Sequence, residues 1–176
     1  FDYFLPSGLI AQSPVNPRDL ARLLHVSQGV LNDYVMRDLP SLLRAGDLLV
    51  ANNTKVIPAQ LYGKIDEKNI GFTLHKQLSK DSWLSFAKPV KKCVVNAIVD
   101  FGSGFKARIG ERRKAGEVLI KFNNSGDSLV EMIEKIGKMP LPPYIKRNRE
   151  GNEADMVNYQ TLFAQKIGAV AAPTAG

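Results

Sequence analysis

The middle of the chain carries the pattern that most constrains its fold. Short runs rich in β-branched, aromatic and other apolar residues follow one another between about residues 61 and 122, and glycines recur among them. Short strands at fairly even spacing are typical of a small barrel or sandwich. The sequence therefore predicts an all-β unit with strands at 61–65, 70–74, 83–87, 93–99, 105–109 and 118–122.

Helical patterns and one apolar run flank this unit. On the N-terminal side we predict a helix over 39–44 and a buried strand over 48–51, because a short apolar run is bounded there by turn residues. On the C-terminal side, Ser128 and Glu131 have the spacing of a capping box, and Gly137 is a natural stop for the helix that follows. A second helix is predicted over 154–164.

Composition excludes several classes of protein. Of the 176 residues, 44% are hydrophobic, yet no apolar run approaches the roughly 18 residues that span a bilayer. Residues 1–14 lack the pattern of a signal peptide, and the single Cys93 allows no internal disulfide, so we expect a cytoplasmic location and no membrane. With His25 and His75 as the only histidines, no metal site is expected.

Positive charge is concentrated in one stretch. Residues 88–121 hold nine basic and three acidic side chains, so this stretch carries six of the seven net positive charges of the chain. Affinity for nucleic acid grows with each phosphate that is neutralised, and we therefore expect a nucleic-acid backbone as the partner. The alternative is a solvated, lysine-rich strand edge that discourages aggregation.

Three segments are unusual for plain scaffolding. Residues 52–59 (Asn-Asn-Thr-Lys-Val-Ile-Pro-Ala) follow the predicted strand, where open α/β sheets bind ligands, although asparagines are also common in turns. Residues 139–147 place a tyrosine and two cations after three prolines, which suits base stacking beside phosphate or a rigid connector. Residues 167–176 are small enough for a ligand to approach the backbone, or form a mobile chain end.

Taken together, these segments resemble the S-adenosylmethionine:tRNA ribosyltransferase-isomerase (QueA) family of queuosine biosynthesis. The resemblance rests on residues 46–59, 139–145, 159–161 and 168–176, supported by residues 5–12 and 22–24. The motifs occur in the family's order over nearly the whole chain. The family usually has arginine where this chain has Lys55, a change that loses bidentate geometry.

The resemblance implies an α/β fold with an inserted all-β domain. Residues 1–60 and 139–176 would form parts of a discontinuous α/β domain, and residues 61–138 a β-barrel-like inserted domain. Family members continue beyond residues 173–176 into a further half, so we expect this chain to be truncated and its catalytic residues, the base above all, to remain unassigned.

The resemblance also implies a reaction. S-adenosylmethionine serves as ribosyl donor, and the acceptor is the aminomethyl group of 7-aminomethyl-7-deazaguanine in tRNA; adenine and methionine leave and epoxyqueuosine forms. We expect no permanently bound cofactor, no obligate protein partner and a monomer.

Site residues follow from the same reading. Those expected to bind S-adenosylmethionine are Asn52, Asn53, Thr54, Lys55, Pro173, Thr174 and Gly176. Those expected to bind tRNA are Tyr144, Lys146, Arg147, Lys91, Lys92, Arg112 and Arg113. The rival hypothesis is a non-enzymatic RNA-binding β-barrel module, which leaves residues 52–59 and 171–176 without a purpose. A conventional methyltransferase has no support, because no glycine-rich loop follows a first strand and opens a helix.

Overall fold

The computed structural model describes residues 2–148 and 151–173. The chain forms two compact units. Unit 1 comprises residues 1–51 and 143–146, and unit 2 comprises residues 52–142 and 147–176. Within the described ranges, no helix combines the length and the apolar character needed to cross a membrane.

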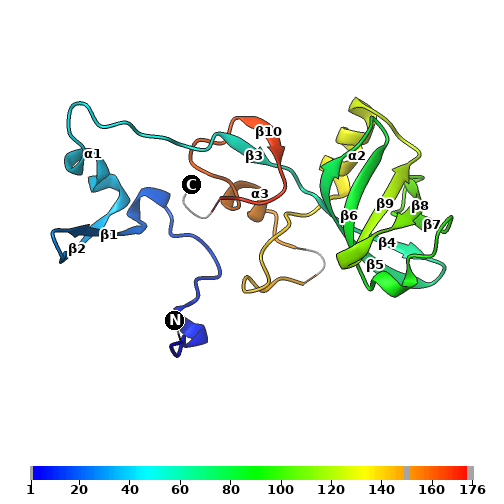
Figure 1. Cartoon of the computed structure of the whole chain (residues 1–176), viewed down its shortest axis with the longest axis horizontal. Coiled ribbons are helices and arrows are strands. Elements are labelled where there is room, and N and C mark those ends of the chain that lie inside the picture. Colours follow the sequence, from blue (N-terminus) through cyan, green and yellow to red (C-terminus); the bar gives the residue numbers. More distant parts are fainter. Residues whose placement is uncertain (1, 149–150, 174–176) are drawn as a thin grey trace. The chain divides into compact units, whose positions relative to one another are not determined.

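A closed barrel of six antiparallel strands dominates unit 2 (Figure 1). The strands are β4 (Gln60–Ile65), β5 (Lys68–Gln77), β6 (Ser82–Lys88), β7 (Ile98–Asp100), β8 (Lys106–Arg112) and β9 (Glu117–Phe122). Their order around the barrel is β4-β5-β6-β9-β8-β7, and β7 pairs with β4 to close it. Closure removes the exposed edges that an open sheet of this size would leave.

Alternation of residue type explains the barrel. Along β4, Leu61, Gly63 and Ile65 point inward and are buried, whereas Tyr62 and Lys64 are exposed. Gly63 is needed for space, because a Cβ there would lie 2.7 Å from Cγ1 of Val99. Phenylalanine rings fill the interior, with Phe105 and Phe122 stacked at 5.2 Å between centroids. Dense apolar packing of this kind is the main stabilising term of such a domain.

The predicted all-β unit is confirmed, with one strand much shorter than expected. The interpretation of 93–99 as a strand is wrong except at its end, because β7 covers only Ile98–Asp100. Two successive turns precede it, in which the Cys93 amide donates to the Val90 carbonyl and the Ala97 amide to the Val94 carbonyl. Asn96 has a positive φ of 68°, which a strand does not accommodate.

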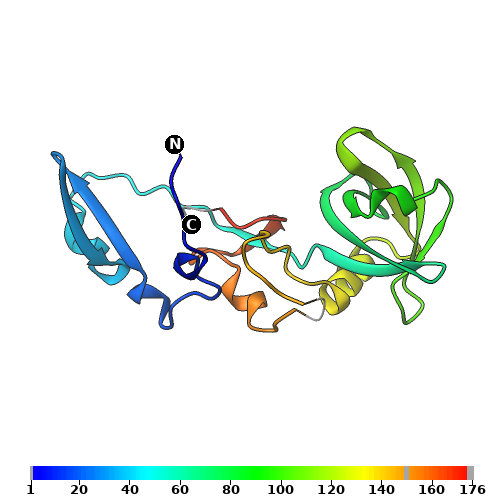
Figure 2. The ribbon, with the colours of Figure 1, turned by 90° about the horizontal axis from the view of Figure 1, so that it is seen from below.

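Helix α2 (Asp127–Ile136) follows the barrel and packs against it through Leu129 and Ile133 (Figure 2). The predicted helix is confirmed, but the capping box is wrong. The helix begins two residues earlier than the capping box predicts, Gly126 is the N-cap, and no side chain caps it. The Ser128 hydroxyl instead accepts a hydrogen bond from Asn124.

Beside the barrel in unit 2 lies a separate two-stranded parallel sheet of β3 (Thr54–Val56) and β10 (Lys166–Ala169). The predicted buried strand at 48–51 is wrong, because the segment is extended but unpaired and Leu48 is 88% exposed. A short apolar run forms a strand only where a neighbouring strand accepts its hydrogen bonds, and no described residue does so here.

The predicted helix over 154–164 is also too long. The structure has α3 (Asp155–Asn158), and Tyr159 leaves helical geometry at φ −91° and ψ 45°. Tertiary hydrogen bonds from the next two residues to the β3 segment take the place of further helical turns.

Unit 1 is built on a hairpin of β1 (Arg22–Ser27) and β2 (Val30–Val35). Gln28 and Gly29 connect the strands, both with positive φ, as a tight two-residue hairpin turn requires. Unit 1 also contains the short 3-10 turns η1 (Ser7–Leu9), η2 (Arg18–Leu20) and η3 (Met36–Asp38). The predicted helix at 39–44 is confirmed as a short one, α1 (Leu39–Leu42).

Candidate functional site

The segment expected to bind S-adenosylmethionine forms the entry to β3. The Asn52 side-chain oxygen accepts a hydrogen bond from the Thr54 amide at 2.8 Å, which makes a local turn. Asn52, Asn53 and Lys55 are exposed, and Thr54 is half-buried. The turn reading of the asparagines is therefore correct for Asn52, and it leaves amide, hydroxyl and ammonium groups at one sheet end.

Residues distant in sequence hold this segment in place. The Gln160 side chain bonds both backbone groups of Val56, accepting from its amide at 2.8 Å and donating to its carbonyl at 2.9 Å. The Thr161 hydroxyl donates to the Asn52 carbonyl at 3.0 Å. The Asn53 carbonyl accepts from the amides of Gln165 and Lys166, where β10 begins. The backbone of 52–56 is thus fixed from one side, which restricts the orientation of its side chains.

The opposite wall of the expected donor site is only partly described. Pro173 is half-buried and follows β10 by a few residues. Thr174 and Gly176 lie outside the described residues. β10 pairs in parallel with β3 within unit 2 and ends at Ala169, so Pro173 follows four residues beyond the paired segment.

Residues 144–146 belong to unit 1, where Gln12 organises them. The Gln12 side chain donates to the Tyr144 carbonyl at 3.0 Å and accepts from the Lys146 amide at 2.8 Å. Tyr144 and Lys146 are exposed. A single amide thus fixes the backbone on which the predicted stacking ring and cation stand.

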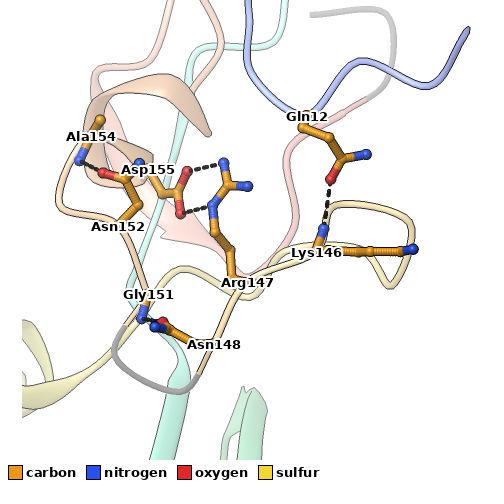
Figure 3. A network of polar contacts seen from close by, with 8 residues as sticks. All are labelled: Gln12, Lys146, Arg147, Asn148, Gly151, Asn152, Ala154 and Asp155. Atoms are coloured by element: carbon orange, nitrogen blue, oxygen red, sulfur yellow. Dashed lines mark hydrogen bonds and ion pairs between the residues drawn. The ribbon is translucent and has the colours of Figure 1, made fainter. Parts of the chain in front are cut away.

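Arg147 is engaged by a carboxylate within unit 2. Its Nε and one terminal nitrogen donate to the two Asp155 oxygens, both at 2.9 Å, in a bidentate pair (Figure 3). These hydrogen bonds from the guanidinium to Asp155 raise the pKa of Arg147. Asp155 is buried, so the pair stabilises the turn at the start of α3. The role predicted for Arg147 from the sequence, contact with tRNA, remains a prediction.

The basic residues expected to hold RNA lie on the barrel exterior. Lys91, Lys92, Arg112 and Arg113 are all exposed. Arg113 is paired with Glu111. Among the described residues, no acidic side chain pairs with the other three.

Two stretches of the basic cluster lie near each other. Lys91 and Lys92 are in the 3-10 turn η4 (Val90–Lys92), directly before Cys93, and Arg112 ends β8. Burial raises the pKa of the Cys93 thiol, and the positive charge of Arg112 opposes that rise. Backbone hydrogen bonds place the two stretches together: the Asn96 amide donates to the Ile109 carbonyl at 2.8 Å, and the Ile109 amide donates to the Ala97 carbonyl at 2.9 Å, so the segment after η4 lies along β8.

A cavity of about 260 Å³ lies between one end of the barrel, α2 and β10. Its lining is mostly apolar, with polar groups from His75, Gln77 and Glu134. None of the residues predicted as site residues lines it.

Several positioning residues were not assigned from the sequence. Gln160 and Thr161 stand in a motif that supported the resemblance, but no local pattern indicated that they hold residues 52–56. Gln12 likewise stands in a supporting motif. Asp155 had no signal, since nothing in the sequence selects it as the partner of Arg147.

The described residues define a protein built on a closed, externally basic six-stranded barrel beside a small parallel sheet. The whole chain, residues 1–176, matches the family described as queuosine biosynthesis protein. The chain belongs to that family.

Curated relatives and one solved structure agree in name. The chain is 50% identical to an S-adenosylmethionine:tRNA ribosyltransferase-isomerase of Sphingopyxis alaskensis, over 99% of this chain and 50% of that protein. It is 45% identical to that of Rhodospirillum rubrum, over 100% of this chain and 50% of that protein. The crystal structure of the S-adenosylmethionine tRNA ribosyltransferase from Thermotoga maritima matches at 31% identity with a TM-score of 0.42, over 82% of this chain and 52% of that one. The chain spans about half the length of the curated relatives it matches.

Proposed function

We propose that the protein transfers and isomerises the ribosyl group of S-adenosylmethionine onto the aminomethyl group of 7-aminomethyl-7-deazaguanine in tRNA. The product would be epoxyqueuosine, with release of adenine and methionine. The observation that carries this proposal is the match of the whole chain to relatives that are named for the same donor and acceptor. The reaction is that of a transferase and isomerase in the cytoplasm, acting as a monomer without a bound cofactor.

The donor site is assigned to residues 52–55 together with residues 173, 174 and 176. Support comes from the parallel pairing of β3 and β10, which brings the start of the 167–176 segment beside residues 54–56. The exposed amides and the Lys55 ammonium offer the donors and acceptors that a nucleoside and a carboxylate require. Tyr144, Lys146 and Arg147 are assigned to the target nucleotide.

The domain arrangement is part of the same proposal. Residues 1–60 and 139–176 would form the α/β domain and residues 61–138 the inserted barrel. Support comes from the barrel strands, which lie between Gln60 and Phe122, and from the bridge between Gln60 and Lys138 where the chain enters and leaves.

Release of free adenine tests the reaction. S-adenosylmethionine would be incubated with the protein and either tRNA carrying the aminomethyl-deazaguanine or unmodified tRNA, and binding of S-adenosylmethionine would be measured alongside. Adenine released only with the modified tRNA is the expected result. Absence of both release and saturable donor binding would instead favour the RNA-binding module.

Salt dependence tests the assignment of the basic cluster. Replacing Lys91, Lys92, Arg112 and Arg113 together with alanine should reduce the slope of log K for tRNA against log salt by about 3, since each phosphate contact contributes roughly 0.7 to 0.9. Lys135→Ala on the exposed side of α2 serves as control and should change the slope by less than 1. An unchanged slope in the fourfold variant would remove the barrel from the RNA-binding surface.

A further inference from the structure

The outer face of strands β4, β5 and β6 carries two exposed aromatic rings that the basic cluster does not account for. Tyr62 is 42% exposed on β4, and Phe86 is 46% exposed on β6. Both rings point out of the barrel, because along each strand they alternate with residues that are buried in the core. Two exposed rings on one face, next to the basic cluster, offer apolar contact area to a partner.

The Tyr62 ring has a defined orientation because its neighbour on β5 has no side chain. Its register partner on β5 is Gly71, and a Cβ at Gly71 would lie only 3.2 Å from Cε1 of the Tyr62 ring. The ring therefore lies across the backbone of β5, which supports it on one side. A ring fixed in this way loses little conformational entropy when a flat group stacks on its open side.

A cation completes the arrangement. On its other side Gly71 pairs with Lys88 of β6, so Lys88 and Tyr62 stand on the same face. The Gln60 amide lies over Gly71 beside the Tyr62 ring, with its Nε2 3.2 Å from the position that a Gly71 Cβ would take. Lys88 is exposed and leads directly into η4, where Lys91 and Lys92 extend the positive charge. An aromatic face beside an ammonium is the arrangement that unpaired nucleotides bind, with the base on the ring and the phosphate on the cation.

Phe86 offers a second ring on the same face, two residues before Lys88. One side of it stacks on His75, with ring centroids 4.5 Å apart and 22° between the planes. Glu117, the nearest carboxylate in register, places Oε1 3.1 Å from Nε2 of His75, although the geometry does not meet that of a hydrogen bond. From strand spacing, Tyr62 and Phe86 are roughly 12 Å apart, so each ring takes a separate base.

We propose that Tyr62 and Phe86, together with Lys88, form a stacking surface for unpaired nucleotides of the RNA substrate. This inference rests on the proposed function and extends it from contact with phosphate to contact with bases. It predicts a preference for RNA that has a single-stranded loop, which the basic cluster alone does not provide.

The experiment compares two RNA probes by fluorescence anisotropy with the whole chain. One is a tRNA anticodon stem–loop, and the other is its stem as a blunt duplex. Tyr62→Ala should weaken binding of the stem–loop about 10-fold while leaving the duplex within 2-fold, since loss of one stacked base costs roughly 5- to 150-fold. Tyr62→Phe should retain the preference, and Lys88→Ala should weaken both probes.

The control is Phe163→Ala, which removes an equally exposed ring outside the barrel and should change neither affinity. The proposal would be overturned if Tyr62→Ala and Phe86→Ala both bind the stem–loop as tightly as the unsubstituted protein does. It would also be overturned if the unsubstituted protein binds both probes with equal affinity. Adenine release distinguishes failure of this inference from failure of the proposed function. The stacking surface can prove wrong while adenine is still released with modified tRNA.

Discussion

Removal of the Asp155 carboxylate should destabilise unit 2 strongly. Asp155 is 5% exposed, and its two oxygens accept both hydrogen bonds of a bidentate pair with Arg147 at 2.9 Å. Asp155→Ala leaves the Arg147 guanidinium, whose side chain is only 20% exposed, without its counter-charge. Removing one partner of a buried pair costs about 3 to 5 kcal/mol.

The partial exposure of Arg147 places the expected loss at the lower end, about 3 kcal/mol. For a chain of this size, such a loss lowers Tm by roughly 6 to 12 °C. Urea unfolding followed by fluorescence suits the measurement, because Trp83 is the single tryptophan and is buried in the barrel of unit 2. Far-UV circular dichroism on the same samples shows whether unfolding is a single transition.

An exposed ion pair provides the control. Arg113 and Glu111 form such a pair on the barrel of unit 2, with side chains 43% and 53% exposed. Glu111→Ala should therefore cost less than about 1 kcal/mol. If Asp155→Ala costs no more than Glu111→Ala, the reasoning that burial and bidentate geometry make the Arg147–Asp155 pair stabilising is refuted. A double-mutant cycle with Arg147→Ala then measures the coupling between the two side chains.

Three further outcomes follow from single positions. Hydrogen bonds from neighbouring serine hydroxyls, first Ser82, and then a lysine lower the pKa of Asp81 to about 2. The Asp81 carboxylate therefore stabilises the fold above the unfolded pKa near 3.8, and this effect is lost as pH falls toward 2. The difference in urea midpoint between the unsubstituted protein and Asp81→Asn should shrink from about pH 5 to about pH 2.5. Gly137→Ala would place a Cβ 2.0 Å from the Pro58 carbonyl oxygen and should cost more than about 2 kcal/mol in thermal unfolding, whereas Gly8→Ala, which meets nothing within 4 Å, should be neutral. Cys93 is fully buried and its thiol pKa is raised by burial, so a thiol reagent should label it only after unfolding; labelling of the folded protein at the rate of a free thiol would contradict its burial.

The barrel could be predicted from the sequence because its signals are local. Most strands alternate apolar and polar residues, as β4 does, and the connections after β7 and β8 contain glycine. The strands find all their partners between Gln60 and Phe122, so pattern and pairing agree over a short span. The 93–99 strand failed because an apolar run gives no sign of two tight turns within it.

The parallel sheet and the site depend on partners far along the chain. The Gln160 amide serves Val56 from 104 positions away, and this bond ends the helix that periodicity predicts over 154–164. The motif at 52–55 was recognisable as a candidate site, but the side chains that hold it were not. Sequence identifies what a segment offers chemically, whereas its support is a tertiary property.

The strand predicted at 48–51 is wrong for a related reason: it has no partner strand. Leu48, Leu49 and Val50 have the composition of a buried strand, yet they are exposed and their backbone pairs with no described residue. The apolar composition of a segment determines how much free energy its burial can contribute. Burial stabilises by about 25 cal/mol per Å² only when another surface covers the segment. Strand formation also requires a hydrogen-bonding neighbour for each backbone group, and the sequence of one segment carries no information about that neighbour. Apolar pattern was therefore sufficient inside the barrel, where the next run along the chain supplies the partner, and insufficient at 48–51, where it does not.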